Sequence, residues 1–184
     1  MDKRIRKTEA ALYRAFAECL NAKDYASLSV EDILRSAKIS RSTFYAHFKT
    51  KDDLLDSILR NIFRHVFSSS LKQEETHDFS HESTLDYEHL FTHTLYHLRD
   101  EKEVVQVILK TSCRDRFLNE LRRQIAPLAE RCVKEGFFPK KNVPEDLRVQ
   151  QCIESFVTLV SYWFQHSCAP SPEDTVALYI ELEK

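Results

Sequence analysis

The chain has 184 residues, of which 42% are hydrophobic and 30% are charged, and it contains a single glycine. This composition favours a helix-rich protein of one or two domains, with enough apolar side chains to form a core. No run approaches the roughly 18 uninterrupted apolar residues of a transmembrane helix, and the N-terminus begins with charged residues. We therefore expect neither a membrane span nor a secretory signal.

The cysteines and the charges narrow the class further. The five cysteines are scattered and form no Cys-x-x-Cys pair, which argues against a disulfide framework or a cysteine zinc site and fits a reducing cytoplasm. The net charge is −2, but residues 1–51 hold 11 Lys and Arg against 6 Asp and Glu, whereas the remainder holds 16 against 23. This asymmetry is a weak indication of a nucleic-acid-facing N-terminal part and an acidic remainder.

The N-terminal part is predicted to form several amphipathic helices. Apolar residues recur at three- and four-residue steps through residues 3–22, which predicts one helix. Ser29, with Asp32 three residues later, is typical of a capping box at the start of a short helix. Ser40 can cap a third, short helix, and Thr50 can cap a fourth, longer one.

The rest of the chain is also predicted to be helical, and no segment alternates convincingly as a strand. Residues 68–83 are polar and are interpreted as a connection. Pro127 should kink or split one helix, and Gly136 is suitably placed for a left-handed helix end. Further helices are expected at residues 84–99, 103–111 and 114–135, from Pro144 to about His166, and from Ser171 onward.

The segment from Ser29 to Lys51 carries the main functional signal. Two short helices are joined by a turn near Lys38, and their apolar positions suit packing at a steep angle, which predicts a helix-turn-helix. The second helix would present short hydrogen-bonding side chains, a guanidinium, an aromatic hydroxyl and an imidazole, which suit a major groove. Two short helices joined by a turn also occur in many proteins that never bind DNA, so spacing alone leaves that alternative open.

The candidate DNA contacts follow from this arrangement. Side chains near the start of the second helix should reach base edges. The residues after them, together with a basic leader at the N-terminus, should contact phosphates. The full set is Lys3, Arg4, Ser29, Ser40, Arg41, Ser42, Thr43, Tyr45, His47, Lys49 and Lys51.

Residues 1–67 resemble the N-terminal domain of the tetracycline-repressor (TetR) family. The resemblance is carried by the strings ALYRAF, SVEDILRSAKIS and, above all, SRSTFYAHFKTKDDLL. It implies an all-α dimer with a three-helix DNA-binding head, here residues 1–50. It also implies a helical body, here residues 51–184, that dimerises and often binds an effector.

The resemblance also assigns roles to individual positions. It implies contacts with bases or nearby backbone at Arg41, Ser42 and Thr43, and phosphate contacts at Tyr45, His47 and Lys51. The chain departs from the family pattern at Lys38, where the family often has glycine. A positive φ at that position would cost roughly 1 kcal/mol for a lysine.

The most apolar helix of the body extends through residues 153–164, and its apolar side chains cover more than half of its circumference. Such a helix must be covered on two sides, which suggests a homodimer through the last two helices. A four-helix dimer bundle is what the resemblance implies, and a buried central helix in a monomer is the alternative. The expected interface residues are Val160, Trp163, Phe164, Val176 and Ile180.

An effector pocket is expected between the body helices. Its candidate lining is Phe63, Phe67, Phe91, Phe117, Leu121 and Phe156. The same residues are more simply explained as ordinary core, because a sequence does not distinguish a packed core from a cavity.

Three histidines, His89, His93 and His97, are spaced four residues apart on one predicted helix face. That face is nearly opposite the apolar face of the same helix, so we expect it to face solvent, with metal binding or pH sensing as the alternative. The cysteines are expected to be buried small hydrophobes, with redox sensing as the alternative. No metal and no other cofactor is expected.

Together these features predict a cytoplasmic, sequence-specific DNA-binding regulator. The favoured form is a repressor that binds a palindromic operator as a homodimer and is released by an effector bound in the body. The alternative is a regulator, including an activator, that a protein partner switches. An enzyme is not expected and no catalytic residue can be assigned, because G-x-S-x-G, H-E-x-x-H and a glycine-rich phosphate loop are all absent.

Overall fold

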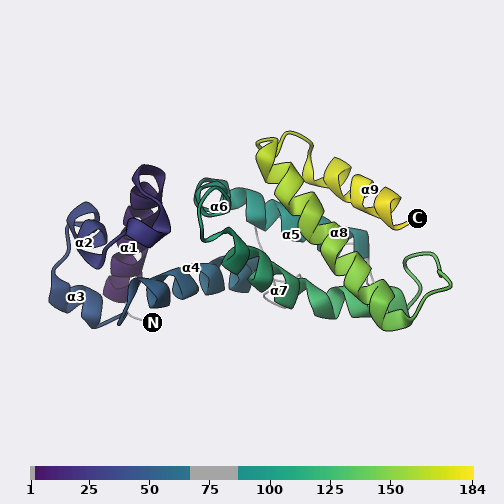
Figure 1. Ribbon diagram of the computed structural model, residues 1–184, viewed down its shortest axis with the longest axis horizontal. Helices are drawn as coiled ribbons and strands as arrows, with labels where there is room; N and C mark the ends of the chain where they lie inside the picture. The colour runs from purple at the N-terminus through teal and green to yellow at the C-terminus, as the bar shows by residue number, and fades with distance from the viewer. Residues whose placement is uncertain (1–2, 67–86) are drawn as a thin grey trace. The chain divides into compact units, whose positions relative to one another are not determined.

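The computed structural model describes residues 3–66 and 87–184, with side chains from Lys7 to Arg64 and from Tyr87 onward (Figure 1). All regular structure within these ranges is helical, which confirms the expected all-α class. In chain order the elements are α1 (Lys3–Ala22), the short 3-10 turn η1 (Tyr25–Ser27), α2 (Val30–Ala37), α3 (Arg41–Tyr45), α4 (Lys51–Val66), α5 (Tyr87–Asp100), α6 (Lys102–Leu109), α7 (Arg114–Lys134), α8 (Glu145–Gln165) and α9 (Pro172–Glu183).

The described residues form two compact units that do not follow the order of the chain. The first, called the head unit, combines the residues up to Asn61 with Glu101–Phe117. The second, called the body unit, combines Ile62–Asp100 with Leu118–Lys184. The first turns of α4 therefore belong to the head unit, and so do α6 and the start of α7.

The head unit has a core of fully buried apolar side chains contributed by α1 to α4. They include Leu12, Phe16, Ile33, Phe44, Leu54 and Leu55. Helix α1 packs against α2 and also against α6. Burying such a set removes several large side chains from water, and this burial stabilises the head unit.

Side chains that cap helix ends explain where the head helices begin. Ser29 and Asp32 form a reciprocal capping box at α2, in which the Asp32 N–H donates to Ser29 Oγ at 3.2 Å. Thr50 and Asp53 exchange the same bonds at α4, at 3.0 and 2.9 Å. Ser40 Oγ accepts an N–H of α3 at 3.1 Å. All three predicted starts are confirmed, and each cap satisfies an amide that the helix leaves unpaired.

The turn between α2 and α3 passes through a left-handed residue. Lys38 has φ 55° and ψ 42°, and its N–H donates to the Leu34 carbonyl at the end of α2. This is the position where the family pattern often has glycine and where the chain departs from it. The helix-turn-helix therefore forms with a lysine in a conformation that glycine adopts without strain.

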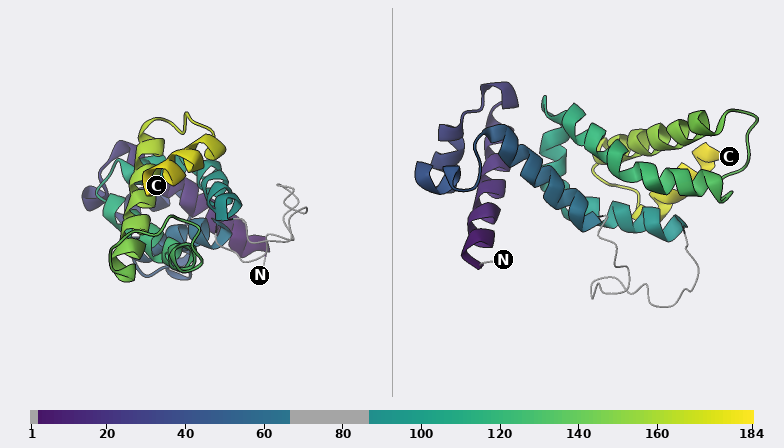
Figure 2. Two further views of the ribbon diagram at one scale, coloured as in Figure 1. Left: turned by 90° about the vertical axis from the view of Figure 1, so that its right-hand side faces the viewer. Right: turned by 90° about the horizontal axis from the view of Figure 1, so that it is seen from below.

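The body unit is built around α9, against which both α5 and α8 pack. Helices α8 and α9 lie side by side in Figures 1 and 2. Their common core is aromatic: the ring centroids of Phe91 and Tyr179 are 4.9 Å apart, and Phe156 lies 5.3 Å from each of them. Edge-to-face and tilted contacts of this kind add to the stabilisation from burial.

Helix ends in the body agree with the sequence, with one difference. Gly136 has φ +75° directly after α7, and Ser171 caps α9 with Pro172 in its first turn. Helix α7 continues through Pro127 as one element, so the proline does not split it. None of the described helices is long and apolar enough to cross a membrane.

The expectation for the histidine face is wrong for two of its three members. His89 is exposed, but His93 and His97 are buried, with their Nε2 atoms 2.9 Å apart. The buried arc of α5 is wider than its large apolar side chains indicate, because Thr92 and Thr94 are buried too. Among the described residues, no group of three potential ligands could hold a metal ion.

The expected dimer interface also needs correction. Val160, Trp163, Phe164 and Val176 are buried within the single chain, and Ile180 is half-buried. Trp163 lies in the chain's own core and donates its Nε1–H to the Pro170 carbonyl at 2.8 Å. The exposed apolar side chains of the same two helices are Tyr162, Leu178 and Leu182.

The candidate pocket residues are part of the packed interior. Phe91 and Phe156 belong to the aromatic core of the body unit, and Phe63, Phe117 and Leu121 are buried. Phe117 belongs to the head unit, so the expected lining is divided between the two units. Phe67 lies outside the described residues.

Candidate nucleic-acid interface

Helix α3 offers a polar outer face on a firmly held base. Phe44 is fully buried beneath the helix, and Arg41, Ser42 and Tyr45 are exposed. Ser40 Oγ lies 2.9 Å from the Ser42 hydroxyl. One buried aromatic side chain thus fixes the rotation of the helix, and this rotation directs its donors and acceptors to solvent.

The strongest candidate for base reading is Arg41. Its Nη2 lies 2.8 Å from Glu31 Oε1, and both side chains are largely exposed, at 70% and 55%. An ion pair in solvent is worth little, so the guanidinium can exchange this carboxylate for a guanine edge or a phosphate at low cost.

The aromatic and basic residues that follow flank this face. The Tyr45 ring is 53% exposed and stands edge-on to the buried Phe44 ring. His47 is half-buried beside Phe48, and Lys49 is exposed. Helix α1 begins at Lys3, and the side chains of Lys3 and Arg4 lie outside the described residues.

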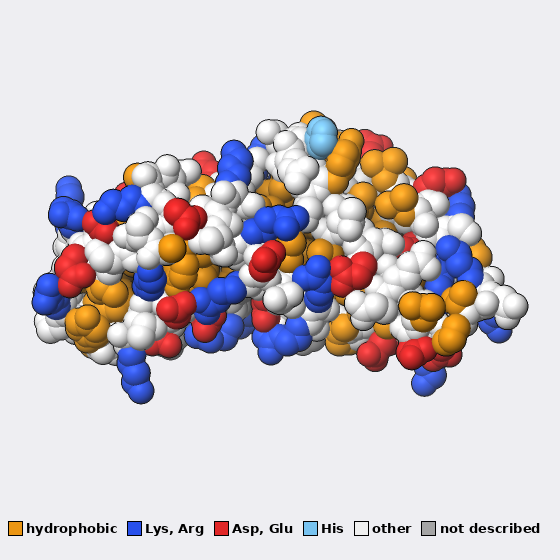
Figure 3. Space-filling model, in the orientation of Figure 1, with side chains coloured by type: hydrophobic (Ala, Val, Ile, Leu, Met, Phe, Trp, Pro, Cys, Tyr) orange, Lys and Arg blue, Asp and Glu red, His pale blue; other side chains and the backbone are white. Residues whose placement is uncertain are grey.

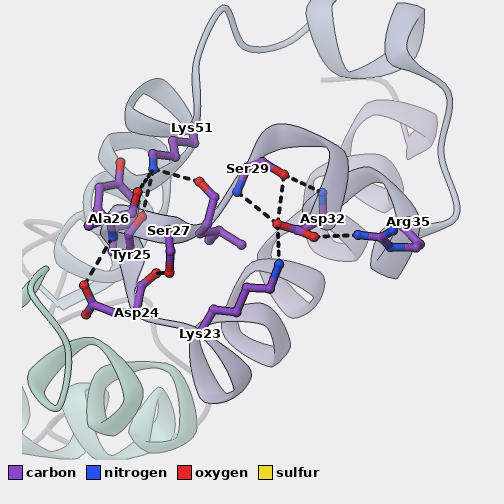
Figure 4. Close-up of polar contacts among 10 residues, drawn as sticks. Lys23, Asp24, Tyr25, Ala26, Ser27, Ser29, Asp32, Arg35 and Lys51 are labelled. Atoms are coloured by element: carbon purple, nitrogen blue, oxygen red, sulfur yellow. Dashed lines mark hydrogen bonds and ion pairs between the residues drawn. The ribbon is translucent and has the colours of Figure 1, made fainter.

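Ser29 has a structural partner in this arrangement. Its hydroxyl donates to Asp32 Oδ2 at 2.8 Å, and the same carboxylate contacts Lys23 and Arg35 (Figure 4). Hydrogen bonds from Lys23 and then from Ser29 hold the pKa of Asp32 well below its usual range. The Ser29 side chain is therefore committed to starting α2.

Lys51 is placed differently from the expected phosphate contact. Its Nζ donates to the carbonyls of Leu28, Tyr25 and Ala26 at 2.7, 2.8 and 3.5 Å, and it lies 4.5 Å from the centre of the Tyr25 ring (Figure 4). An ammonium has three N–H donors, so the three carbonyls use all of them. In this structure Lys51 therefore holds the η1 turn, which differs from the phosphate contact that the family resemblance implies for it.

Sequence reasoning missed the polar residues that meet at this turn. The Tyr25 hydroxyl donates to Asp52 at 2.7 Å, and Asp52 also pairs with Arg116. Ser112 donates to Asp24, which lies 88 positions earlier in the chain. Such long-range pairs leave no periodic pattern in a single sequence. The signal that could reveal them is correlated variation of the two positions among related sequences.

Comparisons with known proteins agree with the arrangement of both parts of the chain. The profile of "Bacterial regulatory proteins, tetR family" matches residues 12–58, and that of "Transcriptional regulator C-terminal region" matches residues 85–182. The chain resembles a TetR transcriptional regulator from Streptococcus agalactiae 2603V, whose crystal structure is known. The TM-score is 0.73 at 25% identity, and the match covers 100% of this chain and 97% of that one.

Two named regulators match part of the chain. The uncharacterized HTH-type transcriptional regulator YxbF of Bacillus subtilis is 32% identical over 44% of this chain and 21% of its own length. The HTH-type dhaKLM operon transcriptional activator DhaS of Lactococcus lactis is 33% identical over 34% of this chain and 34% of its own length. The chain thus matches about a third or less of either relative. With the helix-turn-helix geometry and both profile matches, the chain belongs to the tetR family of bacterial regulatory proteins and is a DNA-binding transcriptional regulator.

Proposed function

We propose that this regulator is a repressor that binds a palindromic operator as a homodimer, through the outer face of α3. The observation that carries the proposal is the exposed row of polar side chains on α3, held above the fully buried Phe44. Arg41 reads a base edge, with Ser42 and Thr43 beside it on bases or nearby backbone. Tyr45, His47 and Lys49 contact phosphates, so they set the affinity and its salt dependence.

The second copy docks on the outer face of α8 and α9. Tyr162, Leu178 and Leu182 are 49%, 47% and 58% exposed, and Figure 3 shows apolar side chains on the surface of these helices. Large exposed apolar side chains on two packed helices favour association with a partner surface. Pairing through this face gives two copies of α3 that read half-sites about one DNA turn apart.

Release by an effector is the proposed switch. A small apolar or aromatic molecule that binds the body would favour a spacing of the two heads that no longer matches successive major grooves. A cytoplasmic location is part of this proposal, because the operator DNA and such small molecules would meet there.

A protein partner is the second candidate for the switch, and activation is the second candidate for its sign. Two observations favour them: the candidate pocket residues Phe91 and Phe156 are in ring contact with Tyr179, and the relative DhaS is named an activator. A body filled by its own aromatic rings offers less room for a ligand than a cavity does.

Selection of bound fragments from a random DNA pool tests the DNA-binding proposal. The full chain should enrich a palindrome, and Tyr45→Ala should lose most of the enrichment without losing its helical circular dichroism. A reporter with the recovered operator inside a promoter then distinguishes repression from activation. A folded, dimeric wild-type protein that enriches no sequence would overturn the proposal.

A further inference from the structure

One segment of the head unit is flanked on both sides in the sequence by residues of the body unit. Residues Glu101–Phe117 belong to the head unit, while the residues directly before and directly after them belong to the body unit. This segment consists of α6, the connection after it, and the first residues of α7, and it is called the inserted segment below. Helix α6 packs against α1, so the segment is an integral part of the head.

The inserted segment holds the η1 turn through Ser112. The backbone N–H of Ser112 donates to Asp24 Oδ1 at 3.2 Å, and its hydroxyl donates to Asp24 Oδ2 at 3.0 Å. Asp24 is also the cap of η1, because its Oδ2 accepts the Ala26 N–H at 3.3 Å. These bonds, with the Ser112 N–H as the largest contribution, lower the pKa of Asp24. One carboxylate therefore joins the inserted segment to the start of the turn.

The segment holds α4 through Arg116. The guanidinium pairs with Asp52 through Nη1 and with Asp56 through Nη2, the latter at 2.6 Å. These two aspartates are one helical turn apart, so a single planar fork spans the first part of α4. Asp52 also accepts the Tyr25 hydroxyl at 2.7 Å, which lowers its pKa and connects Arg116 to the η1 turn.

The η1 turn directly precedes the helix-turn-helix. Lys51 of α4 binds its carbonyls on one side, and Asp24 and Tyr25 attach it to the inserted segment and to α4. Ser29, the cap of α2, follows one residue after Leu28. A movement of the η1 turn would therefore shift α2 directly. It would also shift α3, which the next turn joins to α2.

We infer that Ser112 and Arg116 are positioning residues for operator binding. They act through the η1 turn and α4 and contact no DNA. The inference rests on the proposed function, because it concerns the affinity of α3 for its operator. The groups involved are partly exposed, at 37% for Arg116 and 53% for Asp52, so their loss costs little folding stability. Loss of these side chains also removes the contacts that hold the η1 turn. We therefore expect the main effect on the affinity for operator DNA.

The test compares Arg116→Met and Ser112→Ala with the control Arg123→Met in the full-length protein. Arg123 is an exposed arginine of the body unit whose partner, Glu120, lies one turn away on the same helix. Affinity for the selected operator is measured by fluorescence anisotropy over a series of salt concentrations. Thermal unfolding and the fraction of active protein are measured on the same samples.

Arg116→Met should weaken operator binding by about tenfold, within the range typical of couplings between sites, and Ser112→Ala should weaken it less. The slope of log affinity against log salt should stay at the wild-type value, because no phosphate contact is lost. Arg123→Met should bind as the wild type does. The variant Arg116→Lys should recover only part of the affinity that Arg116→Met loses. Its ammonium keeps the positive charge but cannot bridge two carboxylates as the planar guanidinium does.

Two outcomes overturn the inference. One is an affinity of Arg116→Met equal to that of Arg123→Met after correction for active protein, which would give Arg116 a purely structural role. The other is a salt slope reduced by about one ion, which would make Arg116 a phosphate contact.

Hydrogen exchange separates this failure from a failure of the proposed function. In protein without DNA, Arg116→Met and Ser112→Ala should speed amide exchange at Asp24–Ser29 and in α2, and should leave α8 unchanged. This result stands even if the wild type selects no operator, which would overturn the proposed function alone. Unchanged exchange at these amides would overturn the inference whatever DNA the protein selects.

Discussion

The head and body units use charged groups in opposite ways. Around the η1 turn, Asp24, Asp52 and Arg116 share several partners while remaining partly open to water. In the body unit, Arg148 and Glu183 form an ion pair whose side chains are 5% and 0% exposed. The first arrangement can loosen and re-form at little cost. The second is costly to break, because either charge alone would be left in a medium that solvates it poorly.

The buried pair fixes the last turn of α9 on α8. Arg148 contacts the Glu183 carboxylate through Nη1, and its Nη2 donates to the Glu183 carbonyl at 2.8 Å. The Cys152 thiol donates to the same carboxylate at 3.2 Å, and burial raises the pKa of this thiol to about 12. Tyr179 donates to the Cys152 carbonyl at 3.0 Å. Together these contacts set the rotation of α9, and with it the face that Leu178 and Leu182 present outward.

The largest expected effect breaks this buried pair. Arg148→Met should lower the free energy of unfolding by about 3–5 kcal/mol, since it leaves a carboxylate buried without its cation. The matched control is Arg122→Met, because Arg122 also binds a glutamate with two nitrogens, at 2.7 and 3.0 Å, but both side chains are partly exposed. Its cost should stay under about 1 kcal/mol in urea denaturation. Equal costs would remove the contrast between buried and exposed pairs.

A second change tests the surface that the buried pair orients. Leu182→Glu should raise the dimer dissociation constant by at least roughly a hundredfold, because an unpaired carboxylate is costly to desolvate in an interface. Sedimentation velocity measures this, with Glu181→Gln as the neighbouring exposed control. Trp163→Glu should instead unfold the body, since Trp163 is fully buried. A Leu182→Glu protein that remains dimeric would place the interface elsewhere.

In the head, substitutions of Lys51 and Lys49 should have different effects, the first on folding stability and the second on DNA binding. Lys51→Met should cost about 1–2 kcal/mol of head stability through the lost carbonyl contacts and should leave the salt slope of DNA binding unchanged. Lys49→Met changes an exposed side chain and should flatten the slope by about one ion without loss of stability. The reverse pattern would return the phosphate contact to Lys51.

The smallest effect concerns the left-handed turn. Lys38→Gly should stabilise the protein by up to about 1 kcal/mol, because glycine adopts φ 55° without the steric cost that a Cβ brings. Chemical denaturation measures the change, and a substitution of exposed Lys110 by glycine at the end of α6 provides a comparison at a residue with negative φ. A loss of stability at Lys38 would mean that its side chain makes a favourable contact.

Local chemistry explains which parts of the fold were predictable. The caps at Ser29, Ser40 and Ser171 and the helix end at Gly136 depend on a few neighbouring residues, so the sequence alone indicates them. The family resemblance rests on a contiguous string that contains α3. Both kinds of signal depend on residues that are close together in the sequence. They can therefore be recognised without knowing any tertiary contact.

The failures concern how far a helix is buried and what lies across from it. Periodicity gave the direction of the apolar face of α5 but not the width of its buried arc, so His93 and His97 were expected in solvent. It also showed that α8 is covered on two sides without showing that the chain itself covers Trp163. Lys51 was assigned by its place in a motif, whereas its carbonyl partners come from a turn more than twenty residues earlier.

The split course of the chain through the head unit has a consequence for protein engineering. A chimera that joins residues up to Asn61 to an unrelated body would carry the recognition helix and the η1 turn but not Ser112 or Arg116. Its affinity for the operator would then depend on which residues of the new body packed against α1 and α4 in place of the inserted segment. Transplanting the specificity of this regulator therefore requires moving two stretches of sequence, and Glu101–Phe117 is the second.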